Sequence, residues 1–174
     1  YMKNYMCFLF VFLCGCANIV PPSGGKKDTA PPKLIFSNPE NKTTNFLSNE
    51  IILRFNEYIQ VQNLSEINLS PPCKNKLDVI QKGKELRVLL NCVLDSETTY
   101  TINFGNSIVD LNEGNVLKNF KYIFSTGSEI DSLKITGTTY DLYSSEIIPN
   151  SLVGLYQHAD SLSPYYYAFS EKDG

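Results

Sequence analysis

The sequence is poor in the side chains that carry most catalytic and metal chemistry. It contains a single histidine, His158, in a polar segment that also holds Asp160 and Ser161. A Ser-His-Asp triad needs a nucleophile elbow and a rigid framework that orients the imidazole, and this segment provides neither. One histidine and the cysteines Cys73 and Cys92 do not complete a four-ligand zinc site. We therefore predict no catalytic residues and a solvated loop position for His158.

The chain also lacks a surplus of positive charge and a long hydrophobic run. Lys and Arg number 15 against 18 Asp and Glu, and a net charge of −3 predicts no nucleic-acid partner. The apolar segment Met6–Cys14 reaches roughly ten residues, whereas a helix that crosses the hydrocarbon core needs about 20. Tryptophan is absent, but 11 Tyr and 10 Phe, with many Ile, Val and Leu, favour a β-rich core.

The N-terminal segment has the order of parts of a secretory signal peptide. Lys3 supplies a positive charge, and the apolar core Met6–Cys14 is followed by a small residue before a cysteine. The Leu-Cys-Gly-Cys run at 13–16 resembles the lipobox of bacterial lipoproteins, although a small residue such as Ala or Ser is usual at its second position. The resemblance implies that residues 1–15 are removed and that Cys16 becomes the lipidated first residue. The alternative, a buried N-terminal helix, is disfavoured by the prolines and glycines that follow.

Residues 16–32 are predicted to form a tether. They contain two Pro-Pro pairs and a Gly-Gly pair, and a segment of this composition forms neither a helix nor a central strand of a sheet. We expect the protein in the cell envelope, attached to a membrane through its lipid. No acidic residue directly follows Cys16 to act as an inner-membrane retention signal. The outer membrane is therefore the expected location, and its periplasmic and surface faces both stay open.

From Lys33 onward, short alternating runs are separated by turn residues about every 8 to 12 positions, which is typical of an all-β sandwich. An Ig-like antiparallel β-sandwich of about seven strands is predicted over residues 33–128. The expected strands are 33–37, 50–55, 67–70, 76–80, 86–90, 99–104 and 120–126.

A hairpin within this domain suggests a disulfide. If Lys82-Gly83 is a two-residue loop, its register sets Cys73 opposite Cys92, at a spacing that a disulfide tolerates. Of five cysteines, three remain after signal removal, and lipidation leaves an even pair in an oxidising space. A bulge at Gly83 would shift the register and leave two free thiols. The same register gives three further pairs: Val79 with Leu86 and Leu77 with Val88 on an apolar face, and Asp78 with Arg87 on the outer face.

Two other segments invite a functional interpretation. In the loop 110–115, oxygen-bearing side chains and a glycine resemble part of a calcium loop, so Asp110, Asn112 and Glu113 are candidate calcium ligands, with Glu57 able to join if the second strand ends nearby. The alternative is a structural turn capped by its own side chains, and no other cofactor is expected. Tyr165-Tyr166-Tyr167 offers rings for a sugar, but in a strand they divide between two faces, one of which is expected in the core.

Six short segments of the sandwich region carry a resemblance to a known family: DTAPPK at 28–33, SNPEN at 37–41, ILRFNE at 52–57, TTYTINF at 98–104, DLNEGN at 110–115 and YIFSTG at 122–127. Together they resemble bacterial Ig-like domains of the S-layer SbsA type, over about residues 28–128. The sequence of 103–115 is similar to versions found in lipoproteins of the Bacteroidota, which commonly continue into a carboxypeptidase-regulatory or prealbumin-like β-sandwich.

The resemblance implies that residues 131–174 start a second β-sandwich, with strands at 133–138, 152–156 and 165–169. The terminal Asp-Gly predicts a returning strand, so we expect this partial sandwich to be truncated. The expected function is that of a lipid-anchored envelope protein whose Ig-like module is a non-catalytic spacer or binding scaffold. The alternatives are a presenting module for an envelope enzyme whose catalytic domain lies beyond residue 174, or a carbohydrate-binding or adhesion module. The expected partners are the membrane and an envelope protein or glycan.

Overall fold

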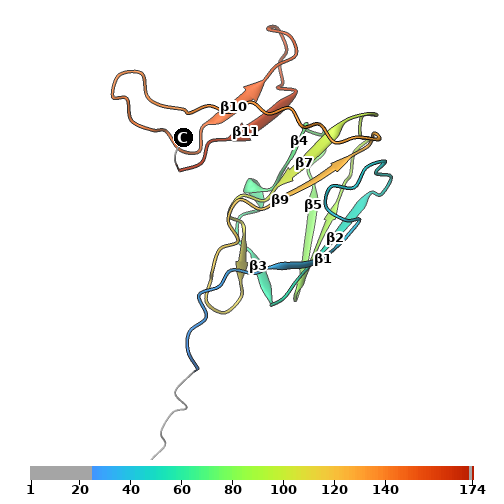
Figure 1. Cartoon of the computed structure of the whole chain (residues 1–174), viewed down its shortest axis with the longest axis vertical. Coiled ribbons are helices and arrows are strands. Elements are labelled where there is room, and N and C mark those ends of the chain that lie inside the picture. Colours follow the sequence, from blue (N-terminus) through green and yellow to red (C-terminus); the bar gives the residue numbers. More distant parts are fainter. Residues whose placement is uncertain (1–24, 173) are drawn as a thin grey trace, which may run out of the picture.

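The computed structural model describes residues 25–172 and 174, and this part of the chain is built from β-strands, without an α-helix (Figure 1). Among these residues, no helix is long and apolar enough to cross a membrane. The elements in chain order are β1 (Leu34–Asn38), β2 (Glu50–Phe55), β3 (Ile59–Val61), the 3-10 helix η1 (Leu64–Glu66), β4 (Asn68–Ser70), β5 (Asp78–Lys82), β6 (Glu85–Leu89), β7 (Thr99–Asn103), β8 (Ile108–Asp110), β9 (Lys121–Ser125), β10 (Leu152–Leu155) and β11 (Tyr166–Phe169).

Two antiparallel sheets form a sandwich. The strand order is β1-β2-β6-β5 in one sheet and β4-β7-β9 in the other, and a short pair, β3-β8, adjoins them. Both sheets contribute to one buried apolar cluster, so the prediction of an all-β, Ig-like sandwich is confirmed. The largest side chains of this cluster with at most 1% exposure are Ile51, Leu53, Phe55, Ile59, Leu86, Val88, Ile102, Phe104, Ile108, Tyr122 and Phe124.

Strand β2 shows why the sequence adopts this arrangement. Successive side chains in a strand point to opposite faces, so Ile51, Leu53 and Phe55 share the inner face, where each is 0% exposed. Burial of each such side chain contributes about 1.5–3 kcal/mol. Arg54 lies on the outer face and stays exposed.

After β1 the chain crosses from one sheet to the other. Lys42 donates its backbone N–H to the Ile123 carbonyl at 2.7 Å, and Phe46 donates to Ser125 at 2.9 Å. The segment therefore pairs with the outer edge of β9 and closes that edge. The Tyr122 hydroxyl donates to the Pro39 carbonyl at 2.8 Å, and burial raises the pKa of Tyr122 to about 12.

The expected strands of the sandwich agree with the structure to within two residues, and 50–55 matches β2 at both ends. Two strands of three residues each, β3 and β8, were not predicted from the sequence. Strand β8 is buried at every position, so it shows no alternation that could have marked it.

The predicted hairpin register was wrong by two residues. The structure pairs Val79 with Val88 and Lys82 with Glu85, so the loop is Gly83-Lys84. Gly83 has φ +64°, and glycine at the first central position is typical of a type II′ hairpin turn. A register shift of two residues leaves every side chain on the same face of the sheet, because side chains alternate with a period of two. The predicted apolar and charged faces are therefore unchanged. The pairs that do not occur are Val79–Leu86, Leu77–Val88 and Asp78–Arg87.

The segment from 131 onward has no buried core of its own. Strands β10 and β11 agree with the strands expected at 152–156 and 165–169 and pair with each other, and every described residue from 131 to 172 is exposed or half-buried. The strand predicted at 133–138 is wrong, because these residues pair with no described strand, and Leu133 is 97% exposed. Among the described residues, three hydrogen bonds join this segment to the sandwich: Asp131 N–H donates to Thr99 Oγ1 at 2.9 Å, Tyr167 N–H to Ser70 Oγ at 3.1 Å, and Asn119 Nδ2 to Glu171 Oε2 at 2.8 Å.

We expect Ile51→Ala to lower the free energy of unfolding by about 2–5 kcal/mol, because Ile51 is 0% exposed in the core. The matched control is Ile80→Ala in the same sheet, where the side chain is 51% exposed and a loss below about 1 kcal/mol is expected. Urea denaturation measures both values. Equal losses for the two variants would contradict the assignment of inner and outer faces.

Candidate functional site

The predicted lipidation site, Cys16, and the signal peptide at residues 1–15 lie outside the described residues. The described part of the tether, residues 25–32, is without regular secondary structure, and only Pro32 within it is buried. The chain joins the sandwich at Lys33, whose N–H donates to Asn56 Oδ1 at 2.6 Å and whose carbonyl accepts from Asn56 N–H at 3.0 Å.

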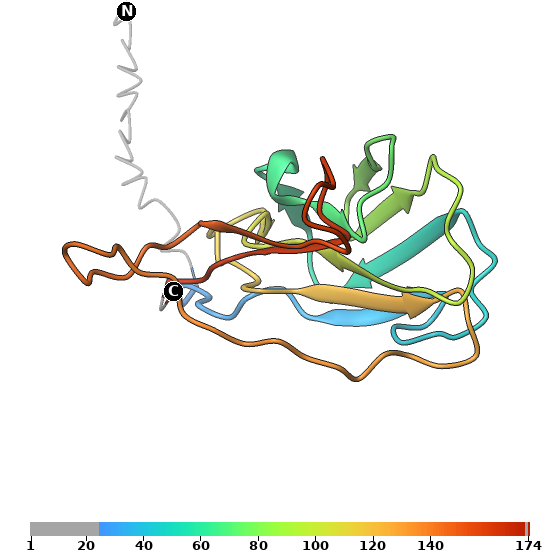
Figure 2. The same ribbon diagram turned by 90° about the horizontal axis from the view of Figure 1, so that it is seen from above.

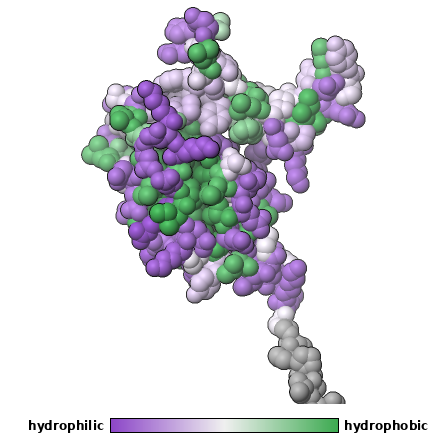
Figure 3. Space-filling view, turned by 180° about the vertical axis from the view of Figure 1, so that it is seen from behind, coloured by the Kyte–Doolittle hydropathy of each residue, from purple (hydrophilic) through white to green (hydrophobic). Residues whose placement is uncertain are grey.

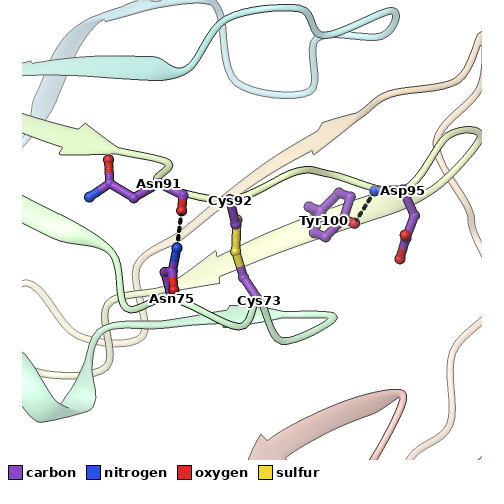
Figure 4. Close-up of a disulfide and its surroundings, with 6 residues drawn as sticks. All are labelled: Cys73, Asn75, Asn91, Cys92, Asp95 and Tyr100. Atoms are coloured by element: carbon purple, nitrogen blue, oxygen red, sulfur yellow. Dashed lines mark hydrogen bonds between the residues drawn. A yellow bond between two sulfur atoms is a disulfide. The ribbon is translucent and has the colours of Figure 1, made fainter.

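The cysteines Cys73 and Cys92 are joined in a disulfide, with Cα atoms 6.1 Å apart (Figure 4). Cys73 follows β4 of one sheet and Cys92 follows β6 of the other, so the bond ties the two sheets together at one end. The β5-β6 ladder stops at the pair Asp78–Leu89, before it reaches either cysteine. The loops beyond the ladder, and not the predicted register, therefore bring the two sulfur atoms together.

Polar contacts hold the segments on both sides of this disulfide (Figure 4). Asn75 Nδ2 donates to the Asn91 carbonyl at 2.6 Å, and Asn91 Nδ2 donates to Asp78 Oδ2 at 2.6 Å. The buried Tyr100 hydroxyl accepts from the N–H of Asp95 at 2.8 Å. These bonds fix the backbone next to both cysteines.

An open hollow of about 400 Å³ lies beside the disulfide. Asp95 is the one ionisable residue that lines it, so the hollow suits an apolar group better than a reaction that moves protons. The other lining residues are Phe46, Leu47, Ser48, Asn49, Leu90, Cys92, Leu94, Ser96 and Thr126.

Hydrophobic residues also gather on the surface. Figure 3 shows a patch of them in the middle of one face, bordered by hydrophilic residues. An apolar patch with a polar border is typical of a surface that contacts another molecule. Within residues 25–126, the exposed large hydrophobic side chains are those of Ile35, Phe36, Leu47, Tyr58, Leu64, Ile80, Val93 and Leu111.

The candidate calcium residue Asp110 is engaged by the backbone of its own loop. Its Oδ1 accepts from the N–H of Glu113 at 2.6 Å and of Gly114 at 3.0 Å, and its Oδ2 accepts from Asn115 N–H at 2.8 Å. Burial acts to raise the pKa of Asp110, but these backbone hydrogen bonds outweigh it and hold the pKa below its ordinary value. Asn112 and Glu113 are exposed.

This geometry favours the structural turn over the calcium loop, because both oxygens of Asp110 already accept hydrogen bonds. The end of β2 does lie nearby, since the Tyr58 carbonyl accepts from Leu111 N–H at 3.0 Å. Across residues 25–172 and 174, no group of three or more His, Cys, Asp and Glu side chains is arranged to hold a metal. Glu57 is one of the described residues, so it is not part of such a group either.

The remaining candidates lie in the segment after the sandwich. His158 is exposed, and its backbone carbonyl accepts from Ser161 N–H at 3.1 Å, which makes a turn and not a triad. The ring centres of Tyr167 and Phe169 are 6.3 Å apart, on the same face of the strand, and the rings meet edge to face. The ring centres of Tyr165 and Tyr166 are 4.9 Å apart, and these rings also meet edge to face. The three tyrosines therefore do not form one flat platform.

The sequence analysis missed a chain of ion pairs on the outer face of the four-stranded sheet. Glu85 lies 3.3 Å from Arg54 and 2.9 Å from Arg87, and Arg87 lies 3.5 Å from Glu50. Hydrogen bonds from Arg87 and then Arg54 lower the pKa of Glu85. All these groups are accessible to water, so each pair contributes little to stability. The pattern becomes visible only when the strand order is known.

A family model described as a bacterial Ig-like domain matches residues 28–126, which contain the whole sandwich. A search of the curated proteins found no match.

A variant with Cys73→Ser and Cys92→Ser is expected to lose about 3 kcal/mol of unfolding free energy, because the bond closes a loop with a sequence separation of 19. Urea denaturation measures the loss. Reductant should lower the midpoint of the wild type and leave that of the variant unchanged. A wild-type midpoint that is insensitive to reductant would argue against the bond.

We expect Asp110→Asn to destabilise the protein at neutral pH, because an amide can replace one carboxylate oxygen as acceptor but not both. The folded-state pKa of Asp110 is lowered, so its ionised form stabilises the fold above the ordinary value of 3.8, and this contribution is lost as pH falls through the lowered value. The difference in Tm between wild type and variant should therefore shrink below about pH 4.

The control for this measurement is Asp160→Asn, at an exposed loop position, which should leave Tm unchanged at both pH values. A rise in Tm on addition of calcium to the wild type, absent in Asp110→Asn, would instead support a cation in the loop.

Proposed function

The chain belongs to the family of bacterial Ig-like domains, and we propose that it is a lipid-anchored protein of the cell envelope whose Ig-like module is a non-catalytic spacer or binding scaffold. Domains of this family are generally non-catalytic. The family alone supports a scaffold or spacer, and the lipid anchor and the envelope location are our extension of it.

The observation that carries the spacer function is the position of the two ends of the module. The chain joins the sandwich beside Asn56 and leaves it at Gly127, whose carbonyl accepts from Asn45 N–H at 2.8 Å. We call these the tether end (Lys33, Phe55–Tyr58 and Gly83-Lys84) and the distal end (Asn49, Leu90, Thr98 and Gly127). Figure 2 shows β1 and β9 running in the same direction between them. The two connections of the module therefore lie at opposite ends, and the segment after Gly127 then returns along the sandwich to Asn119, whose Nδ2 donates to Glu171 Oε2 at 2.8 Å.

The anchor is supported by the lipobox-like run at 13–16 and by the Pro and Gly pairs that separate Cys16 from the sandwich. A disulfide between Cys73 and Cys92 is in keeping with an oxidising compartment. We place the protein at the outer membrane, because no acidic residue directly follows Cys16.

We further propose that residues 131–174 belong to a second β-sandwich. Strands β10 and β11 form a two-stranded sheet, and such a sheet is marginally stable unless other strands cover it. Its side chains Leu152 and Val153 point to opposite faces and are 60% and 50% exposed, so both faces have apolar surface to bury.

The anchor is tested by growth with labelled palmitate, followed by purification and measurement of label in the protein. Cys16→Ala should abolish incorporation, because Cys16 is the acceptor. The matched control is Cys14→Ser, which places a small residue at the second lipobox position and should retain the label. Membrane fractionation and protease treatment of whole cells then assign the membrane and its face. Label retained in Cys16→Ala would overturn the anchor.

A further inference from the structure

We propose that the tether end of the sandwich is a docking surface for the anionic headgroups of the membrane that carries the lipid anchor. This inference rests on the proposed lipid anchor and adds an orientation to it: the module lies with its tether end against the lipid. Three observations carry it, namely a concentration of lysines, two exposed apolar side chains between them, and the position of the tether.

The tether end is rich in lysine although the chain as a whole has a net charge of −3. The exposed lysines there outnumber the carboxylates Asp28, Glu57 and Glu113. The half-buried Glu85, opposite Lys82, is paired with Arg54 and Arg87. Lysine close to an anionic membrane strengthens binding about fivefold per residue. The lysines are Lys26 and Lys27 in the tether, Lys33 where it joins the sandwich, and Lys82 and Lys84 at the β5-β6 turn.

Hydrogen bonds hold two of these lysines, Lys33 and Lys84, on one rigid platform. Lys84 Nζ donates to the Asn56 carbonyl at 2.8 Å, and Asn56 is bonded in turn to Lys33. The carbonyls of Gly83 and Lys84 accept from the N–H groups of Ile59 at 3.1 Å and Phe55 at 2.9 Å. The turn and the tether junction therefore keep a fixed relation to each other.

Two exposed apolar side chains lie within this platform. Tyr58 is 56% exposed and Leu111 is 54% exposed, and their backbones are joined by the 3.0 Å hydrogen bond from Leu111 to Tyr58. Lys84 Nζ lies 5.4 Å from the centre of the Tyr58 ring. Tyrosine flanked by lysine is a pairing that membrane–water interfaces favour, because the ring enters the headgroup layer while the charges meet the phosphates.

The distal end has the opposite character. Its loops carry the carboxylates Asp95, Glu97, Glu129 and Asp131 against the lysines Lys74 and Lys76, so the net charge of this end is negative and an anionic surface would repel it. The tether leaves from the lysine-rich end (Figure 1), and the residues 17–32 span at most about 55 Å when fully extended. The lipid anchor thus keeps the lysines near the membrane, and a weak attraction is enough to orient the module.

The absence of tryptophan makes the test direct, because Tyr58→Trp introduces a single reporter on the proposed surface. The lipidated protein carrying this substitution is reconstituted into vesicles of phosphatidylcholine alone or with phosphatidylglycerol. We expect emission at shorter wavelength, and quenching by brominated lipid, only in the anionic vesicles. About 1 M salt should reverse both, since it shortens the Debye length to about 3 Å. Tyr143→Trp, at a position 96% exposed outside the sandwich, is the control reporter and should not respond.

Matched lysine variants locate the surface. Lys33→Gln with Lys82→Gln should lower the ratio of docked to undocked modules about 25-fold, at about fivefold per lysine. Lys74→Gln with Lys76→Gln removes the same charge from the loop beside the disulfide and should leave the ratio unchanged, with thermal melts confirming that both variants fold.

Flotation of the vesicles tests the lipid anchor separately from the docking surface. Protein that fails to float with either lipid overturns the anchor, and the docking surface with it. Protein that floats but shows equal emission in both lipids overturns the docking surface alone. An equal effect of both lysine pairs would also overturn it.

Discussion

The structure depends on the burial of one apolar face of each sheet against the other. Leu53 and Phe55 on one side, and Ile102 and Phe124 on the other, are excluded from water, and the core is continuous between the two sheets. Alternation along each strand makes this possible, because every second side chain can be polar without entering the core. The outer faces and the loops are left free for other roles.

The two ends of the sandwich have become chemically different. At the tether end, lysines and the exposed Tyr58 surround a junction held by Asn56. At the distal end, the Cys73–Cys92 disulfide, an open hollow of mixed polar and apolar lining and several carboxylates lie together. An elongated module with unlike ends suits a protein that is held at one end and presents the other.

The described part of the segment from 131 onward lacks the buried apolar core that the sandwich has. The hairpin of β10 and β11 pairs its backbone groups well, but no side chain in it is buried. Paired hydrogen bonds alone contribute little net stability, whereas the exclusion of apolar surface from water supplies most of it. The sandwich satisfies both requirements, and the hairpin satisfies only the first.

The facing of the side chains within a strand, as in β2, can be read from the sequence alone, because period-2 alternation is local. The register of the β5-β6 hairpin, the pairing of β3 with β8 and the loops that bring Cys73 to Cys92 arise only in the folded sandwich. The fold also brings Glu85 between two arginines and Tyr58 beside Lys84. These contacts join strands and loops distant in sequence, so they depend on turn geometry and strand order, which no local pattern encodes.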